Sequence, residues 1–120
     1  MGQKVLVVDD DFLIRWSLTQ TLSQAGCEVT TAEDGFKAIE KARDQHFDFV
    51  ITDLSMPVLD GWKLLEALVS FQLPPRVIVI SADGQTDYQS KVKEKGAWAY
   101  VEKSCLIDKI KELLKADSPE

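Results

Sequence analysis

Residues 4–11 have the sequence KVLVVDDD, in which four consecutive apolar residues are followed by three aspartates. Apolar, mostly β-branched side chains on successive residues are typical of a strand that is buried on both faces, as in a parallel sheet. Residues 77–80, with the sequence VIVI, have the same character. We therefore predict that both runs are central strands of one parallel sheet, and that the aspartates mark a polar site at its edge.

Along the rest of the chain, strand-like and helix-like segments alternate five times. The predicted strands are residues 4–8, 27–31, 47–52, 76–80 and 97–102. The predicted helices are residues 12–25, a segment opened by Asp34-Gly35, a segment that follows Asp60-Gly61, and residues 87–95 and 105–115. This alternation predicts an α/β fold with helices on both faces of a five-stranded parallel sheet.

Local signals predict where several of these helices begin and end. We expect Asp34 to cap its helix, because an aspartate side chain accepts a hydrogen bond from the free backbone N–H groups. For Asp11 we favour a cap or turn role over a chemical one. Gly26 and Gly96 are expected helix stops, and Pro74-Pro75 must lie outside a helix.

The composition is that of one globular domain, which we expect to span residues 1–120, either by itself or as a piece of a longer protein. The chain is 45% hydrophobic and carries a formal net charge of −6. A negative charge disfavours direct binding to nucleic acid or to an anionic membrane. No apolar run approaches the length of a membrane span, and the N-terminus enters the first strand without a signal-peptide pattern. We therefore expect a cytoplasmic location.

Polar residues gather where the predicted strands end, which is where open parallel α/β sheets bind their ligands. The residues that follow the strands are Asp9, Asp10, Asp11, Asp53, Ser81 and Lys103. A single serine or lysine at such a position is usually a solvated loop residue. Together, these residues place several carboxylates, a hydroxyl and an ammonium group on one edge of the sheet, and this combination predicts a functional site.

The carboxylates of this group require a positive counter-charge. Two carboxylates about 4 Å apart repel by roughly 4 kcal/mol at an effective dielectric constant of about 20. Magnesium fits, because it binds one or two carboxylates and leaves positions for phosphate oxygens and water. Lys103 adds a point charge suited to a phosphate oxygen, and an aspartate can act as the nucleophile that accepts a phosphoryl group.

Other conspicuous residues do not predict chemistry. His46 lies in a polar loop, and we expect it to be a surface residue. Trp16 and Trp98 are expected to be packing residues rather than ligand platforms. Cys27 and Cys105 match no metal-ligand spacing and are expected to be reduced.

Four blocks of the sequence carry a family resemblance. They are Val7-Val8-Asp9-Asp10, Asp53 with Met56-Pro57 and Asp60-Gly61, Ser81-Ala82, and Gly96-Ala97 with Tyr100 and Lys103. These blocks resemble those of bacterial two-component response-regulator receiver domains over residues 4–115. The resemblance implies a flavodoxin-like (βα)5 fold with strand order 2-1-3-4-5. Asp9-Asp10-Asp11 with Ile14-Arg15-Trp16 is further similar to receivers of the nitrogen-regulator type.

The resemblance implies a phosphorylation switch. Asp53 would accept a phosphoryl group from the phosphohistidine of a sensor histidine kinase or phosphotransfer protein. Asp10, Asp53 and the main-chain carbonyl of Ser55 would bind Mg²⁺, Asp9 would act through bound water, and Lys103 would pair with the phosphate. The domain would catalyse only its own phosphorylation and dephosphorylation, and would therefore not be an enzyme with an external substrate.

The resemblance also implies how the signal leaves the domain. Ser81 would turn towards a phosphate oxygen, and Tyr100 would follow it from an outward to an inward rotamer. An ordinary half-buried aromatic is an equally good interpretation of Tyr100. The face made by the fourth helix, fifth strand and fifth helix would then meet the protein's own output domain or a downstream protein, and a homodimer on activation is compatible with this scheme.

The chain departs from the family pattern directly after the lysine, where Ser104 replaces the usual proline. A cis peptide bond before a non-proline residue costs about 2.5–4 kcal/mol. We therefore expect either a trans bond with a rearranged loop or a strained site, with Ser104 as a candidate cap of the last helix. Ser81 replaces the commoner threonine, and Ser55 and Asp83 occupy positions that tune phosphoryl hydrolysis in this family.

Three other functions agree with parts of the sequence. A degenerate receiver that acts as a phosphorylation-independent interaction module is favoured only by the Lys103-Ser104 departure. A flavin-binding electron carrier needs a phosphate loop after the first strand, where the three aspartates would repel phosphate. An aspartate-nucleophile phosphatase uses acids two residues apart, as Asp9 and Asp11 are, but the block around Asp53 argues against it.

Overall fold

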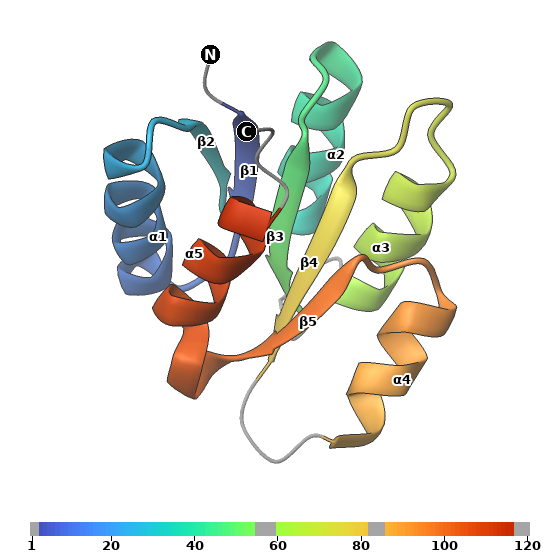
Figure 1. The fold of residues 1–120 in the computed structure, drawn as a ribbon. Coiled ribbons are helices and arrows are strands. Elements are labelled where there is room, and N and C mark those ends of the chain that lie inside the picture. The colour runs from blue at the N-terminus through green and yellow to red at the C-terminus, as the bar shows by residue number, and fades with distance from the viewer. Residues whose placement is uncertain (1–2, 55–59, 82–85, 117–120) are drawn as a thin grey trace.

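The computed structural model describes residues 3–54, 60–81 and 86–116 (Figure 1). Its elements are β1 (Lys4–Val8), α1 (Phe12–Gln24), β2 (Glu28–Ala32), α2 (Gly35–Asp44), β3 (Phe49–Asp53), α3 (Gly61–Val69), β4 (Arg76–Ser81), α4 (Thr86–Glu94), β5 (Ala99–Glu102), a 3-10 turn (Lys103–Cys105) and α5 (Leu106–Ala116). Strand and helix alternate five times, as predicted. None of the helices in the described ranges is long and apolar enough to cross a bilayer.

The five strands form one parallel sheet. Their order is β2-β1-β3-β4-β5, and each neighbouring pair is parallel. Helices α1 and α5 cover one face, and α2, α3 and α4 cover the other (Figure 1). The predicted α/β fold and the 2-1-3-4-5 order implied by the resemblance are confirmed.

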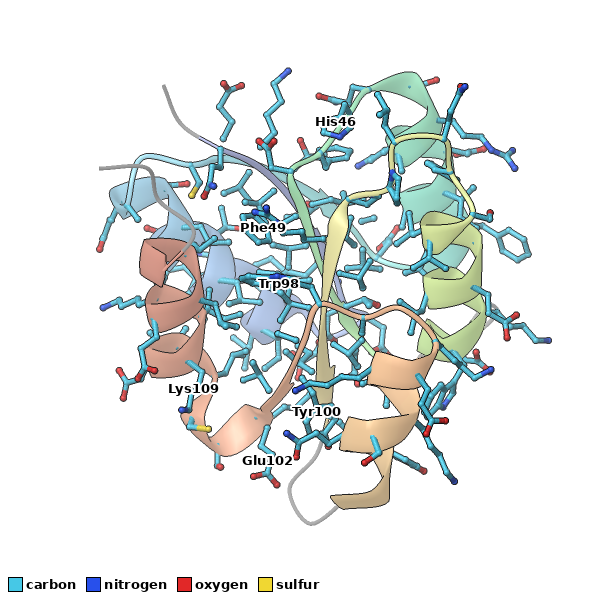
Figure 2. The ribbon with its side chains drawn as sticks, turned by 45° about the vertical axis from the view of Figure 1, so that its right-hand side comes forward. His46, Phe49, Trp98, Tyr100, Glu102 and Lys109 are labelled. Carbon is cyan, nitrogen blue, oxygen red and sulfur yellow. The ribbon has the colours of Figure 1, made fainter. Side chains whose placement is uncertain are left out.

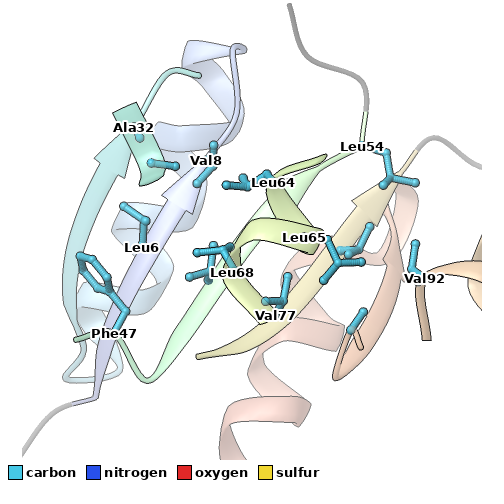
Figure 3. Packing of buried hydrophobic residues seen from close by; sticks show 14 residues of the cluster. Leu6, Val8, Ala32, Phe47, Leu54, Leu64, Leu65, Leu68, Val77 and Val92 are labelled. Carbon is cyan, nitrogen blue, oxygen red and sulfur yellow. The ribbon is translucent and has the colours of Figure 1, made fainter. Parts of the chain in front are cut away.

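Successive residues of the central strands enter opposite halves of the core. In β1, Val5 and Val7 pack in the half beneath α1 and α5, whereas Leu6 and Val8 pack in the half beneath α2, α3 and α4. Figure 3 shows the second half, in which Leu64, Leu65 and Leu68 of α3 lie over the strands. Because both faces are buried, these strands are apolar on consecutive residues.

The predicted helix caps are present. The Asp11 carboxylate accepts a hydrogen bond from the Leu13 N–H at 2.9 Å, and the Asp34 carboxylate accepts one from the Lys37 N–H at 2.9 Å. Gly26 has a φ of 92° and follows α1 after one residue, as expected of a helix stop. The cap role of Asp11 also fixes the direction in which the chain leaves β1.

Several boundaries differ from the predicted ones by one or two residues, and two of these shifts bear on the site. β3 spans Phe49–Asp53 rather than residues 47–52, because Asp53 pairs with Ile80 of β4 in parallel register. β4 extends to Ser81, which pairs with Glu102 of β5. Asp53 and Ser81 are therefore the last residues of their strands, and the sheet holds their backbones in place.

Three residues were predicted to have no chemical role: His46, Trp98 and Trp16. His46 is exposed, as predicted, and lies at the opposite end of the molecule from Glu102 (Figure 2). Trp98 packs on one side, with its ring centroid 5.3 Å from that of Phe49, while 37% of the residue stays exposed. The packing role expected for Trp16 is wrong, because this side chain is 54% exposed. α1 buries Leu18 instead, and a residue two positions away points to the other side of a helix.

Gly61, the first residue of α3, lies against the end of β3. A Cβ atom at this position would be 2.2 Å from the Asp53 carbonyl oxygen and 2.6 Å from the Leu54 Cα. The Gly61 N–H donates to the Leu54 carbonyl at 2.9 Å. Only glycine allows α3 to start this close to the carboxyl end of β3, so this contact positions Asp53.

We predict that Gly61→Ala destabilises the protein by about 3 kcal/mol, because the new methyl group meets backbone atoms that cannot rotate away. Gly26→Ala is the matched control. It places its methyl group in open space and is strained only by its φ of 92°, which costs about 1–2 kcal/mol. Urea unfolding of the two variants measures the difference, and equal midpoints would contradict the close contact at Gly61.

Candidate functional site

Three carboxylates meet at the carboxyl end of the sheet. β1 and β3 are neighbours in which Val8 pairs with Thr52, so the next residues, Asp9 and Asp53, lie side by side. One carboxylate oxygen each from Asp9, Asp10 and Asp53 lies within 4.8 Å of the others. Asp9 and Asp53 are buried, and Asp10 is exposed. The cluster therefore has a buried floor and one side open to solvent.

Asp9 is the most constrained member of this cluster. Its Oδ1 accepts a hydrogen bond from the Asp11 N–H at 2.9 Å, and its main-chain carbonyl accepts one from Arg15 Nη1 at 2.6 Å. Its Oδ2 is buried and has no hydrogen-bond partner among the described residues. Burial raises the pKa of Asp9 from its ordinary value of 3.8 to about 6, and the charges of Asp53 and Asp10 add to this rise.

These features fit a hard divalent cation. A buried carboxylate oxygen without a partner costs free energy unless it is protonated or faces a positive charge. Carboxylate oxygens are the ligands that Mg²⁺ and Ca²⁺ prefer, and the exposed Asp10 leaves one side of the cluster accessible to water. The acidic cluster of Asp9, Asp10 and Asp53 is thus suited to the Mg²⁺ ion expected from the sequence.

Lys103 completes the charge pattern from the other side. Its Nζ lies 2.8 Å from Asp53 Oδ2, and its side chain is partly exposed. Burial opposes the charged ammonium, but the hydrogen bond to Asp53 and the charges of Asp53 and Asp9 outweigh burial, so the pKa of Lys103 is raised. Asp53 is therefore held between a cation on one side and two acids on the other.

The loop after Lys103 has a definite form. The described residues contain no cis peptide bond, so the Lys103–Ser104 bond is trans. Lys103–Cys105 forms a 3-10 turn that leads directly into α5, with Ser104 at its centre. Of the two expectations for this departure, the trans bond with a rearranged loop is the one observed. The Lys103 amine reaches Asp53 in this arrangement without the usual proline.

Ser81 and Tyr100 lie on neighbouring strands at the same end of the sheet. Ser81 is buried, and Tyr100 is partly buried and packs against the core half beneath α3 and α4. Figure 2 shows Tyr100 and Glu102 following each other along β5. Ser55 and Asp83 lie outside the described residues, as does the Met56-Pro57 block.

Two contributions to the site were not predicted from the sequence. Arg15, on the first turn of α1, anchors the main chain at Asp9. Gly61 brings α3 against Asp53. The sequence signal for Gly61 was its place after Asp60 in a turn-like pair, which indicates a turn but not the close backbone approach. A role for Arg15 had no local signal, since it depends on the direction of the side chain.

The fold and this site define a class of protein, the phosphorylatable receiver domains of two-component signalling and phosphorelays. The sequence model described as the response regulator receiver domain matches residues 5–115. The chain belongs to this family. Receiver domains are signalling switches, and the family generally binds Mg²⁺ in an acidic pocket.

Individual relatives are similar over nearly the whole chain. The chain is 34% identical to Protein PilG of Pseudomonas aeruginosa, covering 98% of this chain and 89% of that protein. It is 30% identical to sporulation initiation phosphotransferase F of Bacillus subtilis, covering 99% and 96%. Among solved structures, the chemotaxis protein CheY4 of Vibrio cholerae superposes with a TM-score of 0.85 at 29% identity, covering 97% of this chain and 98% of that one.

A further solved structure bears on the nitrogen-regulator resemblance. NtrX of Brucella abortus superposes with a TM-score of 0.89 at 28% identity. The match covers 97% of this chain but only 26% of the NtrX chain. This likeness agrees with the nitrogen-regulator resemblance of the Asp9-Asp10-Asp11 segment.

The raised pKa of Asp9 predicts a pH-dependent stability in metal-free buffer. A carboxyl group with a raised native pKa favours the folded state fully below about pH 4, and this contribution is lost as the pH rises through about 6. The Asp9→Asn variant has no carboxyl group to ionise at this position and does not lose this stability. The difference in unfolding free energy between Asp9→Asn and wild type should therefore increase, in favour of the variant, by about 3 kcal/mol from about pH 4 to about pH 7.

Urea unfolding at several pH values measures this difference, and an NMR titration of the Asp9 side-chain carbon reports its pKa directly. Added Mg²⁺ should reduce the advantage of Asp9→Asn at neutral pH, because it supplies the missing counter-charge. An advantage that stays constant with pH would contradict the assignment of the shift to Asp9.

Proposed function

We propose that this chain is a cytoplasmic phosphorylation switch, a single receiver domain by itself or within a longer regulator, in which Asp53 accepts a phosphoryl group from a phosphohistidine of a sensor kinase or phosphotransfer protein. The observation that supports the proposal most directly is the arrangement of charged groups around the Asp53 carboxylate. It lies at the end of β3, 2.8 Å from the Lys103 amine and within 4.8 Å of two further carboxylates. Family membership supports the same reaction class.

In the proposed reaction, a carboxylate oxygen of Asp53 attacks phosphorus. The new bond joins oxygen to phosphorus, the phosphorus–nitrogen bond of the donor breaks, and the imidazole leaves with that electron pair and takes up a proton. Hydrolysis by water later returns the free carboxylate and inorganic phosphate. The chain's contribution is to position the nucleophile and to balance charge, because phosphoryl transfer needs little other covalent assistance.

Asp10, Asp53 and the main-chain carbonyl of Ser55 are the proposed Mg²⁺ ligands, with Asp9 acting through bound water. When bound, the ion offsets the charge of the carboxylates and of the incoming phosphoryl oxygens. The buried Oδ2 of Asp9 supports this assignment, since it has no hydrogen-bond partner within the described ranges. Arg15 keeps the Asp9 backbone in place for this role by its hydrogen bond to the carbonyl.

Lys103 has two successive partners in this scheme. Before transfer its amine pairs with Asp53 Oδ2, which keeps the carboxylate oriented. After transfer the same amine pairs with a phosphate oxygen, because the phosphoryl group then occupies the side of Asp53 that the ammonium faces. A flexible point charge suits this change of partner better than a rigid guanidinium fork.

Ser81 and Tyr100 are the proposed link to the output. Ser81 would donate its hydroxyl to a phosphate oxygen, and Tyr100 would move inward as Ser81 turns. Tyr100 lines a groove of about 440 Å³ between α4, β5 and α5, together with Gln89, Lys93, Glu102, Lys109 and Glu112. Figure 2 shows where three of these residues lie: Tyr100 and Glu102 on β5, and Lys109 on α5. We propose that an output domain or a downstream protein binds this face.

The first test is the intact mass of the protein after incubation with acetyl phosphate, with and without Mg²⁺. We expect the gain of one phosphoryl group in wild type that requires Mg²⁺, and no gain in Asp53→Asn. The Asn side chain keeps the size of Asp53 but offers no carboxylate nucleophile. Absence of phosphorylation under every condition, also with several phosphohistidine donors, would overturn the proposal in favour of a phosphorylation-independent interaction module.

The second test separates the two effects of Lys103. Lys103→Met should slow phosphorylation by acetyl phosphate about 100-fold, since it removes a positive group that faces the developing charge. The same variant should bind Mg²⁺ more tightly, because a cation next to Asp53 has been removed. Stopped-flow kinetics and isothermal titration calorimetry measure the two quantities. Lys103→Arg keeps the charge and should keep the Mg²⁺ affinity; a loss of affinity in Lys103→Met would contradict the electrostatic argument.

A further inference from the structure

We propose that a second polar pocket, at the free edge of the sheet, binds a small anion that carries a diphosphate or triphosphate group. The pocket has a volume of about 240 Å³. It is lined by Arg15 from α1, Thr31 and Ala32 from β2, Glu33 from the following turn, and Lys37 and Lys41 from α2. We refer to it as the edge pocket. Its lining contains none of Asp9, Asp10 and Asp53, but Arg15 lines it and also donates to the Asp9 carbonyl.

The charge of the edge pocket is opposite to that of the chain. Three of its lining side chains are cationic and one, Glu33, is anionic. The whole chain carries a formal net charge of −6. The charges of Asp34 and Glu40 also reach Lys37, but neither residue lines the pocket. A local excess of cations in an acidic chain attracts anions to this place.

Two of the cations are held in place by groups that do not cancel their charge. Arg15 Nη1 donates to the Asp9 carbonyl at 2.6 Å, and the Lys41 amine donates to the Thr31 carbonyl. A main-chain carbonyl is a neutral acceptor, so neither hydrogen bond pairs a cation with a carboxylate. Glu33 is the acid whose charge also reaches Arg15. Because these long side chains are already ordered, an anion that binds them loses less conformational entropy.

The third cation is paired in a way that an anion can replace. Lys37 contacts Glu33 four residues earlier, and both side chains are more than half exposed. Exposed pairs of this kind contribute only about 0–1 kcal/mol. A bound phosphate could therefore replace Glu33 as the partner of Lys37 at a small cost in free energy. Lys37 would then contact the same anion as Arg15 and Lys41.

The size and chemistry of the pocket favour a short phosphate chain. Its volume lies just below the range of about 300–1,000 Å³ typical of sites for drug-sized molecules. A guanidinium group offers a planar pair of donors to phosphate oxygens, and ammonium groups offer point charges. One guanidinium with two ammonium groups matches an anion with several adjacent charged oxygens better than a single carboxylate.

A different role for the same lysines gives a different experimental result. β2 is an edge strand, and a lysine beside an edge strand discourages pairing with another chain. In that case Lys41 would protect the edge and no anion would bind. Removing Lys41 would then increase self-association and change nothing in the response to anions.

The test is an NMR titration of the complete metal-free chain with sodium pyrophosphate at constant ionic strength. We expect the amide signals of Thr31, Ala32, Glu33, Lys37 and Lys41 to shift with saturation, and those of Ser81 and Lys103 to stay in place. A parallel titration with ATP distinguishes a nucleotide ligand from an inorganic one, because a nucleoside that contributes contacts lowers the dissociation constant relative to pyrophosphate.

Matched variants decide whether the edge pocket is the site. Lys41→Gln and Lys37→Gln should each raise the pyrophosphate dissociation constant about tenfold, and Arg15→Gln should do the same if it folds. Arg43→Gln is the control, since Arg43 is exposed on the same helix but does not line the pocket. Either an absence of saturable shifts or an equal loss in Arg43→Gln would overturn the proposal. Self-association of Lys41→Gln without any change in the anion response would overturn it too.

Discussion

Mutual repulsion of carboxylates at one end of the sheet is the constraint on which the rest of the structure depends. Parallel pairing of β1 with β3 brings two buried aspartates together, and a third joins them from the following turn. Two such charges repel by roughly 4 kcal/mol at about 4 Å and a dielectric constant of about 20. The Lys103 ammonium beside Asp53 and the Asp11 N–H that donates to Asp9 offset part of this repulsion. The same repulsion suits the cluster to a cation, as we propose for Mg²⁺.

Contacts from elements that are distant in the sequence hold this cluster in place. Lys103 reaches Asp53 from the turn after β5, and Arg15 holds the Asp9 carbonyl from α1. Gly61 lets α3 start against the end of β3. Replacement of the usual proline by Ser104 leaves this arrangement intact, because a 3-10 turn with a trans bond brings Lys103 to the same carboxylate.

Arg15 connects two regions of opposite charge. Its guanidinium touches the main chain of the acidic cluster and at the same time lines the basic edge pocket. Because the Asp9 carbonyl is neutral, its hydrogen bond leaves the positive charge of Arg15 able to interact with the acidic cluster and with an anion in the edge pocket. An anion in the edge pocket and a cation in the acidic cluster would therefore lie on the two sides of one ordered side chain.

Most of the fold and most of the site residues could be predicted from the sequence, because both follow from local patterns. Apolar runs on consecutive residues determined that the sheet is parallel and covered on both faces, and polar residues at the strand ends determined where a site would form. Caps at Asp11 and Asp34 were also local signals. For the same reason, the acids and Lys103 could be named before their distances were known.

Tertiary structure alone decided how these residues meet. The shift of β3 that makes Asp53 a strand residue depends on pairing with β4, which no local pattern reports. The raised pKa of Asp9 depends on burial by other elements, and the exposure of Trp16 depends on which face of α1 packs on the sheet. The edge pocket likewise unites side chains from α1, β2 and α2. Contacts between distant segments have no sequence period, and only the folded chain brings them together.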